Sequence, residues 1–248
     1  MRLVSFIDPT GAAGVGRLDG EAVAVLRAPT MLDWLRGDGH EATGTHHALA
    51  GVTLRAPVPP AWCAAPAFYF ANPASIHGPG EAARRPDTTR ELDFELEIAA
   101  IVGADGSIAG YTLLNDLSAR DIQREEVTVG LGPSKGKDFA TALGPWLVTP
   151  DELPIHDGRL QLEATVAVNG VELTRCDAAA QHFSWPQIAA HAARDTRLRP
   201  GDVLGSGTLE RGCLLELGPV VDGHRWLEPG DSVTLSAPGL GALTTPVI

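Results

Sequence analysis

Hydrophobic and polar residues alternate along most of the chain in short runs, which glycine, proline, asparagine and aspartate separate. Alternation with a period of two residues is typical of strands that bury one face. Beyond the first quarter of the chain, the strand-like runs are "AFYFA", "DFELEIAAIVG", "AGYTLLND", "GPWLVT", "LQLEATVAVNGVEL", "CLLELG" and "SVTLSAPG". Helical patterns are fewer, and the clearest are "SARDIQREE" and "SWPQIAAHAARD". The sequence therefore predicts a β-rich α+β fold with helices packed outside the sheets.

The first part of the chain predicts a smaller unit of its own. Residues 1–58 contain the strand-like runs "RLVSFI", "GVGRL" and "AVAVL", followed by a helical run "TMLDWLRG" that Gly37 ends. Residues 59–65 lie in the proline-rich segment "RAPVPPAWCAAPA", and proline stiffens the chain and cannot donate to a strand ladder. We therefore expect a small N-terminal α+β domain over residues 1–58, a linker over 59–65 and a main domain over 66–248.

Composition narrows the classes of partner. The 248 residues carry a formal net charge of -12, which disfavours nucleic acid and anionic membrane surfaces. No apolar run approaches the length of a membrane span, and Asp8 and Pro9 interrupt the apolar start before a signal-peptide core forms. Cys63, Cys176 and Cys213 show no paired spacing, so we expect reduced thiols. These features predict a cytoplasmic protein whose guest is a cation.

The segment "LDFELEIAAIVG", residues 92–103, combines a buried-strand pattern with acidic residues at every second position. Asp93, Glu95 and Glu97 share one face of a strand, with successive members about 7 Å apart. Like charges crowded on a half-buried face cost stability unless something positive lies among them. The pattern therefore predicts either a solvated acidic face or a cation site.

A second acidic residue set follows in "GYTLLNDLSARDIQ". Asp116 lies at the end of a predicted strand, and Ser118 is expected to cap the next helix, with Asp121 completing a variant capping box. Arg120 and Gln123 then lie on one face of that helix. If the two strands are neighbours, Glu95, Glu97 and Asp116 supply three hard oxygen ligands for Mg²⁺, Mn²⁺ or Ca²⁺. The alternative is an exposed acidic sheet face beside a capped helix.

The chain has two lysines, and both lie in the glycine-rich segment "GLGPSKGKDF". The segment lacks the glycine and the hydroxyl residue that a phosphate-binding loop requires. Lysine differs from arginine as a compact charge with a tunable pKa, so Lys135 and Lys137 suggest a functional loop, with a flexible surface loop as the alternative. In "RPGDVLGSGTLERGCLLEL", Gly207 and Thr208 form a turn whose N–H groups could bind an anionic oxygen. Glu216 follows in a predicted apolar strand, as an edge residue or a buried acid.

Together these segments resemble the fumarylacetoacetate hydrolase family over most of residues 66–248. The signatures, in order, are "FYFANPASIHGPG", "LDFELEIAAIVG", "YTLLNDLSARDIQ", "GPSKGKDFATALGPWLVTPDEL" and "LRPGDVLGSGT". The tail "GSGTLERGCLLEL" is more similar to the fumarylacetoacetases than to the shorter acylpyruvase and isomerase branches. The resemblance implies a mixed β-roll for the large domain, commonly in a homodimer.

The resemblance also implies roles for individual residues. Three carboxylates would hold a divalent metal, Mg²⁺ or else Mn²⁺ or Ca²⁺: Glu95, Glu97 and Asp116. Three further residues would bind the substrate's oxygens and stabilise a carbanion or enolate: Arg120, Gln123 and Lys137. The turn residues Gly207 and Thr208 would contact a substrate carboxylate, and Glu216 would orient a catalytic histidine.

One departure from the family pattern concerns that histidine. Fumarylacetoacetases carry a segment after the proline-rich linker that begins D-F-Y and supplies a fourth metal ligand and the histidine that activates water. Here Pro60 runs almost directly into "AWCAAPAFYF", so both residues are missing. Without a positioned base, hydrolysis loses a contribution of about 10²- to 10⁴-fold. His77 could substitute, although a turn role is expected for it, and packing or surface roles are expected for the histidines at 46, 47, 182 and 191.

Two readings of function remain open at this point. The first is a divalent-metal-dependent enzyme that acts on a small oxo-acid or 1,3-dicarbonyl through a metal-stabilised enolate, with C–C bond hydrolysis, decarboxylation or isomerisation as the outcome. The second is a catalytically degenerate family member that binds a ligand or partner, or a specialised biosynthetic enzyme. Retention of the expected metal and substrate residues favours the first reading, whereas the missing histidine segment is the kind of change that the second would show.

Overall fold

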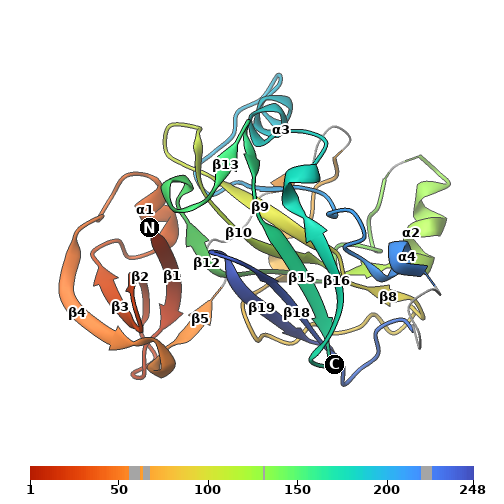
Figure 1. Cartoon of the computed structure of the whole chain (residues 1–248), viewed down its shortest axis with the longest axis horizontal. Coiled ribbons are helices and arrows are strands. Elements are labelled where there is room, and N and C mark those ends of the chain that lie inside the picture. Colours follow the sequence, from red (N-terminus) through yellow and green to blue (C-terminus); the bar gives the residue numbers. More distant parts are fainter. Residues whose placement is uncertain (56–61, 64–67, 131, 219–224) are drawn as a thin grey trace.

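The computed structural model describes residues 1–55, 62–63, 68–130, 132–218 and 225–248. Within these residues most strands join one long mixed sheet (Figure 1). Its order is β4 (Ala42–Ala48), β3 (Ala22–Leu26), β2 (Ala13–Asp19), β1 (Arg2–Ile7), β12 (Thr141–Val148), β10 (Ile108–Asp116), β9 (Leu96–Val102), β17 (Val203–Gly205) and β6 (Trp62–Cys63). Two short strands lie off this path: β5 (Thr53–Arg55) beside β1, and β7 (Ile76–His77) beside β12.

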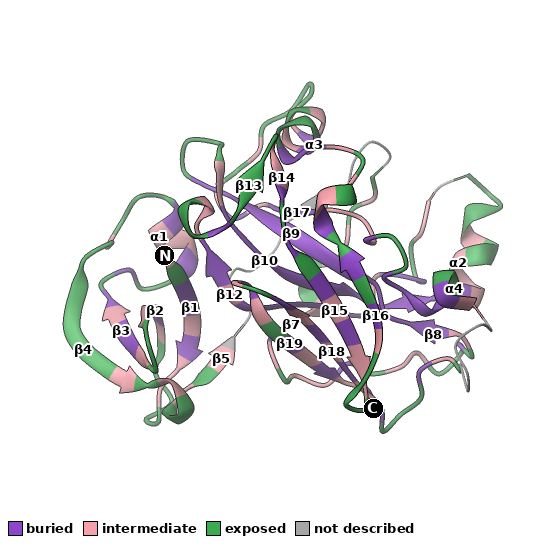
Figure 2. Cartoon of the chain, in the orientation of Figure 1, coloured by how far each residue is buried: buried purple, intermediate pink, exposed green. Residues whose placement is uncertain are grey.

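A second sheet packs across the middle of the first. Its order is β16 (Val171–Asp177), β15 (Glu163–Val168), β18 (Ser232–Ala237) and β19 (Gly241–Pro246). Strands β18 and β19 contact β10 and β12, so the largest hydrophobic cluster fills the space between the two sheets. Figure 2 shows β9, β10 and β12 as almost continuously buried, whereas β4 lies exposed at the far edge. The β-rich α+β prediction is confirmed.

The remaining elements are short. Two small antiparallel ladders pair β8 (Leu92–Asp93) with β11 (Ser118–Ala119) and β13 (Ile155–His156) with β14 (Arg159–Leu160). The α-helices are α1 (Met31–Leu35), α2 (Arg120–Val127), α3 (Trp185–Ala192) and α4 (Leu214–Leu217). Single 3-10 turns cover Leu49–Gly51, Pro73–Ser75, Pro150–Glu152 and Ala178–Ala180. No helix in the described ranges is long and apolar enough to cross a membrane.

The N-terminal strands are joined directly to the main sheet. Arg2 and Leu3 of β1 pair with Val148 and Leu147 of β12, so the sheet continues from the first unit into the second. Most of the predicted linker, residues 59–65, lies outside the described residues, and its Trp62–Cys63 forms β6 beside β17. The division at residue 58 therefore stays a prediction.

Three local predictions were wrong. Residues 68–71 of "AFYFA" are not a strand, and "CLLELG" forms helix α4 because Asp93 accepts hydrogen bonds from the first N–H groups of that helix. Ser118 does not cap α2, because it lies in β11 and its hydroxyl donates to Asp116 O at 3.0 Å. Asp121 instead accepts hydrogen bonds from Arg90 N and its own neighbour, Ile122 N.

The other two helical patterns do form helices with local caps. Helix α1 has a capping box between Thr30 and Asp33, and α3 has one between Ser184 and Gln187. Gly37, just after α1, takes a φ of 100°, a conformation that glycine adopts without the steric cost of a Cβ. Of the cysteines, Cys176 and Cys213 are free and buried.

Candidate metal centre

Three buried carboxylates meet where β9 and β10 run side by side. Glu97 lies in β9 opposite Leu114 of β10, and Asp116 lies at the end of β10, where its N–H donates to Glu95 O at 3.2 Å. One ligand oxygen from each of Glu95, Glu97 and Asp116 lies within 4.8 Å of the others. The three residues are only 4–7% exposed. The structure therefore brings together the carboxylates that the sequence singled out, and the reading as an exposed acidic face is excluded.

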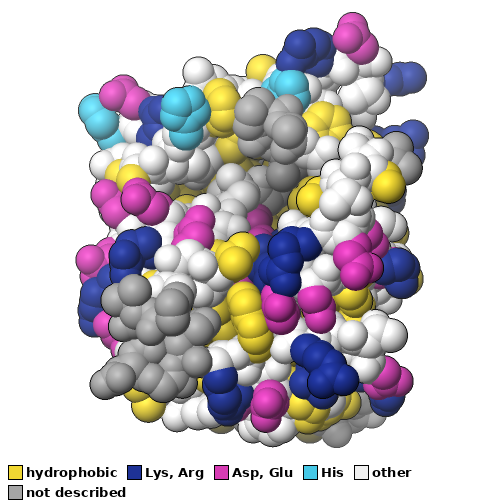
Figure 3. All heavy atoms as spheres, turned by 90° about the vertical axis from the view of Figure 1, so that its right-hand side faces the viewer, with side chains coloured by type: hydrophobic (Ala, Val, Ile, Leu, Met, Phe, Trp, Pro, Cys, Tyr) yellow, Lys and Arg dark blue, Asp and Glu magenta, His cyan; other side chains and the backbone are white. Residues whose placement is uncertain are grey.

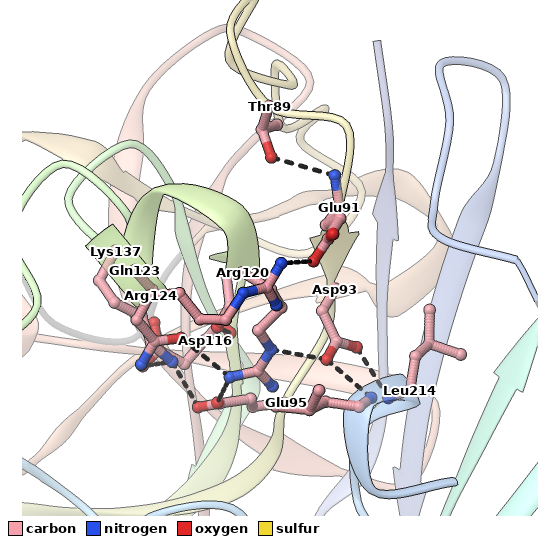
Figure 4. A network of polar contacts seen from close by, with 12 residues as sticks. Thr89, Glu91, Asp93, Glu95, Asp116, Arg120, Gln123, Arg124, Lys137 and Leu214 are labelled. Carbon is pink, nitrogen blue, oxygen red and sulfur yellow. Dashed lines mark hydrogen bonds and ion pairs between the residues drawn. The ribbon is translucent and has the colours of Figure 1, made fainter. Parts of the chain in front are cut away.

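Two positively charged side chains, Lys137 and Arg120, lie against this cluster. Lys137 Nζ is 2.6 Å from Glu95 Oε2 and 3.1 Å from Asp116 Oδ2, and Arg120 Nη1 is 2.7 Å from Glu95 Oε1 (Figure 4). Both cationic side chains are buried, so solvent screens these three ion pairs much less than it would screen exposed pairs. The two cations leave the negative charge of the cluster only partly compensated, because three carboxylates face them.

The uneven contacts set the pKa of each carboxyl. Burial opposes ionisation of Glu95, but Lys137 and Arg120 together outweigh it and hold the Glu95 pKa below its ordinary value. Burial, helped by repulsion from Glu95, raises the pKa of Asp116 despite Lys137. Burial and the charges of Asp116 and Glu95 raise the pKa of Glu97 well above its ordinary value. A further positive charge would therefore stabilise the ionised form of Glu97 more than that of the other two carboxylates.

Asp93 does not join the three carboxylates and instead forms an ion pair with Arg120. The strand breaks between β8 and β9, so the Asp93 side chain accepts a hydrogen bond from Arg120 Nε at 2.8 Å. It also accepts from Leu214 N at 2.8 Å and Leu215 N at 3.1 Å, at the start of α4 (Figure 4). Arg120 is thereby fixed between Asp93 and Glu95, while its Nη2 has no hydrogen-bond partner in the described part of the chain.

The residues present fit a divalent cation. The donor set is three carboxylates, which suits Mg²⁺, Mn²⁺ or Ca²⁺. Asp116 Oδ1 is buried and has no hydrogen-bond partner among the described residues, although a buried carboxylate oxygen normally has one. An unpartnered oxygen beside a cluster with excess negative charge is a feature that a bound cation would satisfy.

The lysine loop is held against α2. Gly136 lies so close to the helix that a Cβ there would come within 2.9 Å of Gln123 N. The Glu126 carboxylate accepts hydrogen bonds from the backbone N–H groups of residues 134, 135 and 136 at 2.7, 2.5 and 3.1 Å. These contacts place Lys137 in the cluster, while Lys135 stays exposed and pairs with Asp138. Gln123 Oε1 accepts from Arg120 Nη1 at 3.1 Å, so the expected pair on α2 also meets.

The glycine turn after β17 borders the cluster from the other side. A Cβ on Gly205 would lie 2.6 Å from Glu97 Oε2, so any other residue there would displace that carboxylate. Gly207, at φ 75°, donates its N–H to the same Glu97 oxygen at 3.1 Å. Gly207 and Thr208 line a groove of about 390 Å³ together with Glu216. Glu216 lies in α4 rather than in the predicted strand. This side of the molecule carries intermingled acidic and basic side chains (Figure 3).

No histidine takes part in the hydrogen bonds and ion pairs that the three carboxylates make within the described residues. His77 lies in β7, and β12 separates that strand from β10. His182 lines the groove beside Glu216 and stacks edge-on against Phe183. His191 packs near Phe68, and the histidines at 46 and 47 lie in the outer strand β4.

The sequence reading missed Tyr69. Its hydroxyl donates a hydrogen bond to Asp116 Oδ2, and its ring centroid lies 5.8 Å from Lys137 Nζ. Burial and the nearby carboxylates raise the pKa of this phenol, so it stays protonated and remains a donor. Because residues 68–71 read as one more strand, nothing in the local pattern indicated that its middle residue enters the site.

Comparisons with known proteins identify the family of the chain. The family model "Fumarylacetoacetate (FAA) hydrolase C-terminal" matches residues 41–248, and "Rv2993c-like, N-terminal" matches residues 1–57. A fumarylacetoacetase of Arabidopsis thaliana is 32% identical over 266 residues, covering 77% of this chain and 62% of the relative. One of Bos taurus is 31% identical over 252 residues, covering 76% and 59%. The chain spans about three fifths of the length of these curated relatives.

Solved structures match over the whole chain. A 2-hydroxyhepta-2,4-diene-1,7-dioate isomerase from Mycobacterium marinum has a TM-score of 0.79 at 27% identity, covering 100% of this chain and 98% of that one. A 5-carboxymethyl-2-hydroxymuconate delta-isomerase from Mycobacterium smegmatis has a TM-score of 0.78 at 27% identity, covering 100% and 99%. A fumarylacetoacetate hydrolase from Exiguobacterium antarcticum shares the fold, with a TM-score of 0.84 at 23% identity and coverage of 100% and 99%. The chain belongs to the fumarylacetoacetate hydrolase family.

Proposed function

We propose that this protein is a divalent-metal-dependent enzyme that acts on a small oxo-acid or 1,3-dicarbonyl compound. The observation that carries the proposal is the buried cluster of Glu95, Glu97 and Asp116 with Lys137 and Arg120 against it. Carboxylates buried without a structural need are costly, so their gathering at one point favours a functional site. The three carboxylates would hold Mg²⁺ or Mn²⁺, and a divalent cation bound there would polarise adjacent carbonyl oxygens of the substrate.

The protein's own groups supply the rest of the chemistry. Removing a proton, CO₂ or an acyl group next to a carbonyl leaves negative charge on the substrate's oxygen, and fixed cationic groups stabilise such charge in a site poor in water. Lys137 is buried beside the carboxylates, and Arg120 has an unpartnered, buried Nη2 that could donate to a substrate oxygen. Asp93 holds Arg120 in place through Nε. Gly207 and Thr208 line the adjoining groove, and because the Gly207 N–H already donates to Glu97, Thr208 is the residue of this turn that would donate to a substrate carboxylate.

The reaction that these groups support best is one that needs no activated water. The hydrogen bonds and ion pairs of the three carboxylates include no histidine within the described residues. Among the described residues, a water beside the carboxylates would therefore have no histidine bonded to them as its base, and His182 lines the adjoining groove instead. Two solved neighbours at 27% identity are isomerases, whereas the curated relatives are fumarylacetoacetases. We therefore rank keto-enol isomerisation and decarboxylation of a β-oxo acid above hydrolysis of a C–C bond.

The experiment is turnover of a panel of small oxo-acids with Mg²⁺ or Mn²⁺, with and without a chelator. We expect oxaloacetate decarboxylation or oxo-acid tautomerisation that the chelator abolishes, and little hydrolysis of acylpyruvates or fumarylacetoacetate. Glu97→Ala should abolish both metal binding in calorimetry and turnover, whereas the exposed Glu172→Ala on β16 should change neither. Metal binding without turnover of any substrate would favour the ligand-binding alternative. Fumarylacetoacetate hydrolysis at about 1 s⁻¹ or faster would reverse the ranking of reactions.

A further inference from the structure

Tyr69 contacts the carboxylate cluster although no regular element carries it. The residue lies between the predicted linker and β7, and its hydroxyl donates to Asp116 Oδ2. Its side chain is partly buried, while the rings of Phe68 and Phe70 on either side stack edge-on at 5.6 Å and are exposed. The chain therefore turns one aromatic residue of three consecutive ones into the site.

The segment that carries Tyr69 is tied to the lysine loop. Asn72 Nδ2 donates to Asp138 O at 3.3 Å and to Ser75 Oγ at 2.9 Å. Asp138 follows Lys137 directly, so the Tyr69 segment and the Lys137 loop are anchored to one another. The phenol and the ammonium group consequently approach Asp116 together, with the Tyr69 ring centroid 5.8 Å from Lys137 Nζ.

These contacts distinguish the two oxygens of Asp116. Oδ2 accepts from the Tyr69 hydroxyl and also from Lys137 Nζ at 3.1 Å. Oδ1 is buried and has no partner among the described residues. Two donors on one oxygen fix the plane of the carboxylate and leave the other oxygen without a donor among the described residues.

We propose that Tyr69 is a positioning residue for the metal centre: its hydroxyl, together with Lys137, holds Asp116 Oδ2 so that Oδ1 is presented to the cation. The inference rests on the proposed metal-dependent function and adds to it the group that orders Asp116. Residues that hydrogen-bond a metal ligand set its orientation, and their loss usually weakens metal affinity by about 10- to 100-fold.

Calorimetric titration with Mn²⁺ tests the inference, because the chain contains two tyrosines and the second is a matched control. Tyr111 is buried in the core against Trp185, at a ring distance of 5.3 Å. We expect Tyr69→Phe to weaken Mn²⁺ binding about 10-fold and Tyr111→Phe to leave it unchanged. Equal affinity of Tyr69→Phe and the unmodified protein would overturn the inference while leaving the metal site standing. Absence of Mn²⁺ binding by the unmodified protein would overturn both proposals.

A spectroscopic measurement keeps the inference testable if Tyr69→Phe folds poorly. Protein labelled with fluorotyrosine should give two ¹⁹F resonances, and Tyr111→Phe should remove one and thereby assign the other to Tyr69. On addition of Mg²⁺ we expect the Tyr69 resonance to shift and the Tyr111 resonance to stay. A static Tyr69 resonance under conditions where calorimetry shows Mg²⁺ bound would refute the role. Appearance of tyrosinate absorption on metal binding would also refute it, because Tyr69 would then be a ligand itself.

Discussion

Replacing Lys137 by methionine removes a buried positive charge from the centre of the cluster while keeping a side chain of similar length. Lys137 is 3% exposed and contacts two carboxylates, at 2.6 Å to Glu95 and 3.1 Å to Asp116. Removing one partner of a buried ion pair usually costs about 3–5 kcal/mol, because the remaining charge is left uncompensated. Protonation of a carboxyl would relieve part of this cost, so we expect about 3 kcal/mol for the metal-free protein.

Urea unfolding of the metal-free protein measures this cost. With a slope of about 2 kcal/mol per molar urea, the loss lowers the unfolding midpoint by about 1.5 M. Added Mg²⁺ should restore more stability to Lys137→Met than to the unmodified protein, because the cation then supplies the missing positive charge. Saturation at a hundred times the dissociation constant contributes about 2.7 kcal/mol. Turnover should be lost even with metal bound, because the charge that develops on the substrate lacks its stabilising ammonium group.

Lys135→Met is the matched control, since Lys135 is the other lysine of the same loop and is 74% exposed. An exposed ion pair such as Lys135–Asp138 contributes at most about 1 kcal/mol. We therefore expect Lys135→Met to keep its stability, its Mg²⁺ response and its turnover. Equal unfolding midpoints for Lys137→Met and the unmodified metal-free protein would refute the electrostatic reasoning. Full turnover by Lys137→Met would show that the ammonium group of this residue has no part in catalysis.

Substitutions at Gly205 and Glu126 probe the surroundings of the cluster, and one at Asp231 probes the stability of the fold elsewhere. Gly205→Ala places a Cβ within 2.6 Å of Glu97 Oε2 and displaces that carboxylate, so calorimetry should show metal affinity reduced about 10-fold; unchanged affinity would contradict a fixed position of Glu97 in the metal site. Glu126→Ala frees three backbone N–H groups of the lysine loop and should lower kcat more than it raises KM, whereas Glu126→Gln should retain part of the activity. Hydrogen bonds from Arg225 hold the Asp231 pKa below its usual value, so this carboxylate stabilises the fold above about pH 4 and ceases to do so as acid protonates it. Urea unfolding of Asp231→Asn should therefore show a loss at neutral pH that fades below about pH 3, and a pH-independent loss would contradict this.

The sequence by itself determined the β-rich character of the fold and the chemistry of the cluster. A strand places every second side chain on one face, so Glu95 and Glu97 had to lie together in any strand that contained them. Asp116 ends the next strand, β10, so a hairpin between the two strands could bring it beside them. Local hydrogen bonding also decided the starts of α1 and α3, because a capping box depends on residues three apart in the chain.

Tertiary structure alone decided which polar groups meet these carboxylates. Asp93 has the same spacing in the sequence as Glu95 and Glu97. Its carboxylate instead accepts hydrogen bonds from Arg120 and from the first N–H group of α4, and it lies outside the cluster. The short apolar run that forms α4 has no local signal that separates helix from strand. The Asp93 carboxylate accepts hydrogen bonds from its first N–H groups and thereby favours the helix. Tyr69 enters the site through anchoring contacts with the lysine loop, and those contacts join residues far apart in sequence. Period and spacing are properties of neighbours along the chain, whereas the orientation of a buried carboxylate depends on donors that only folding brings to it.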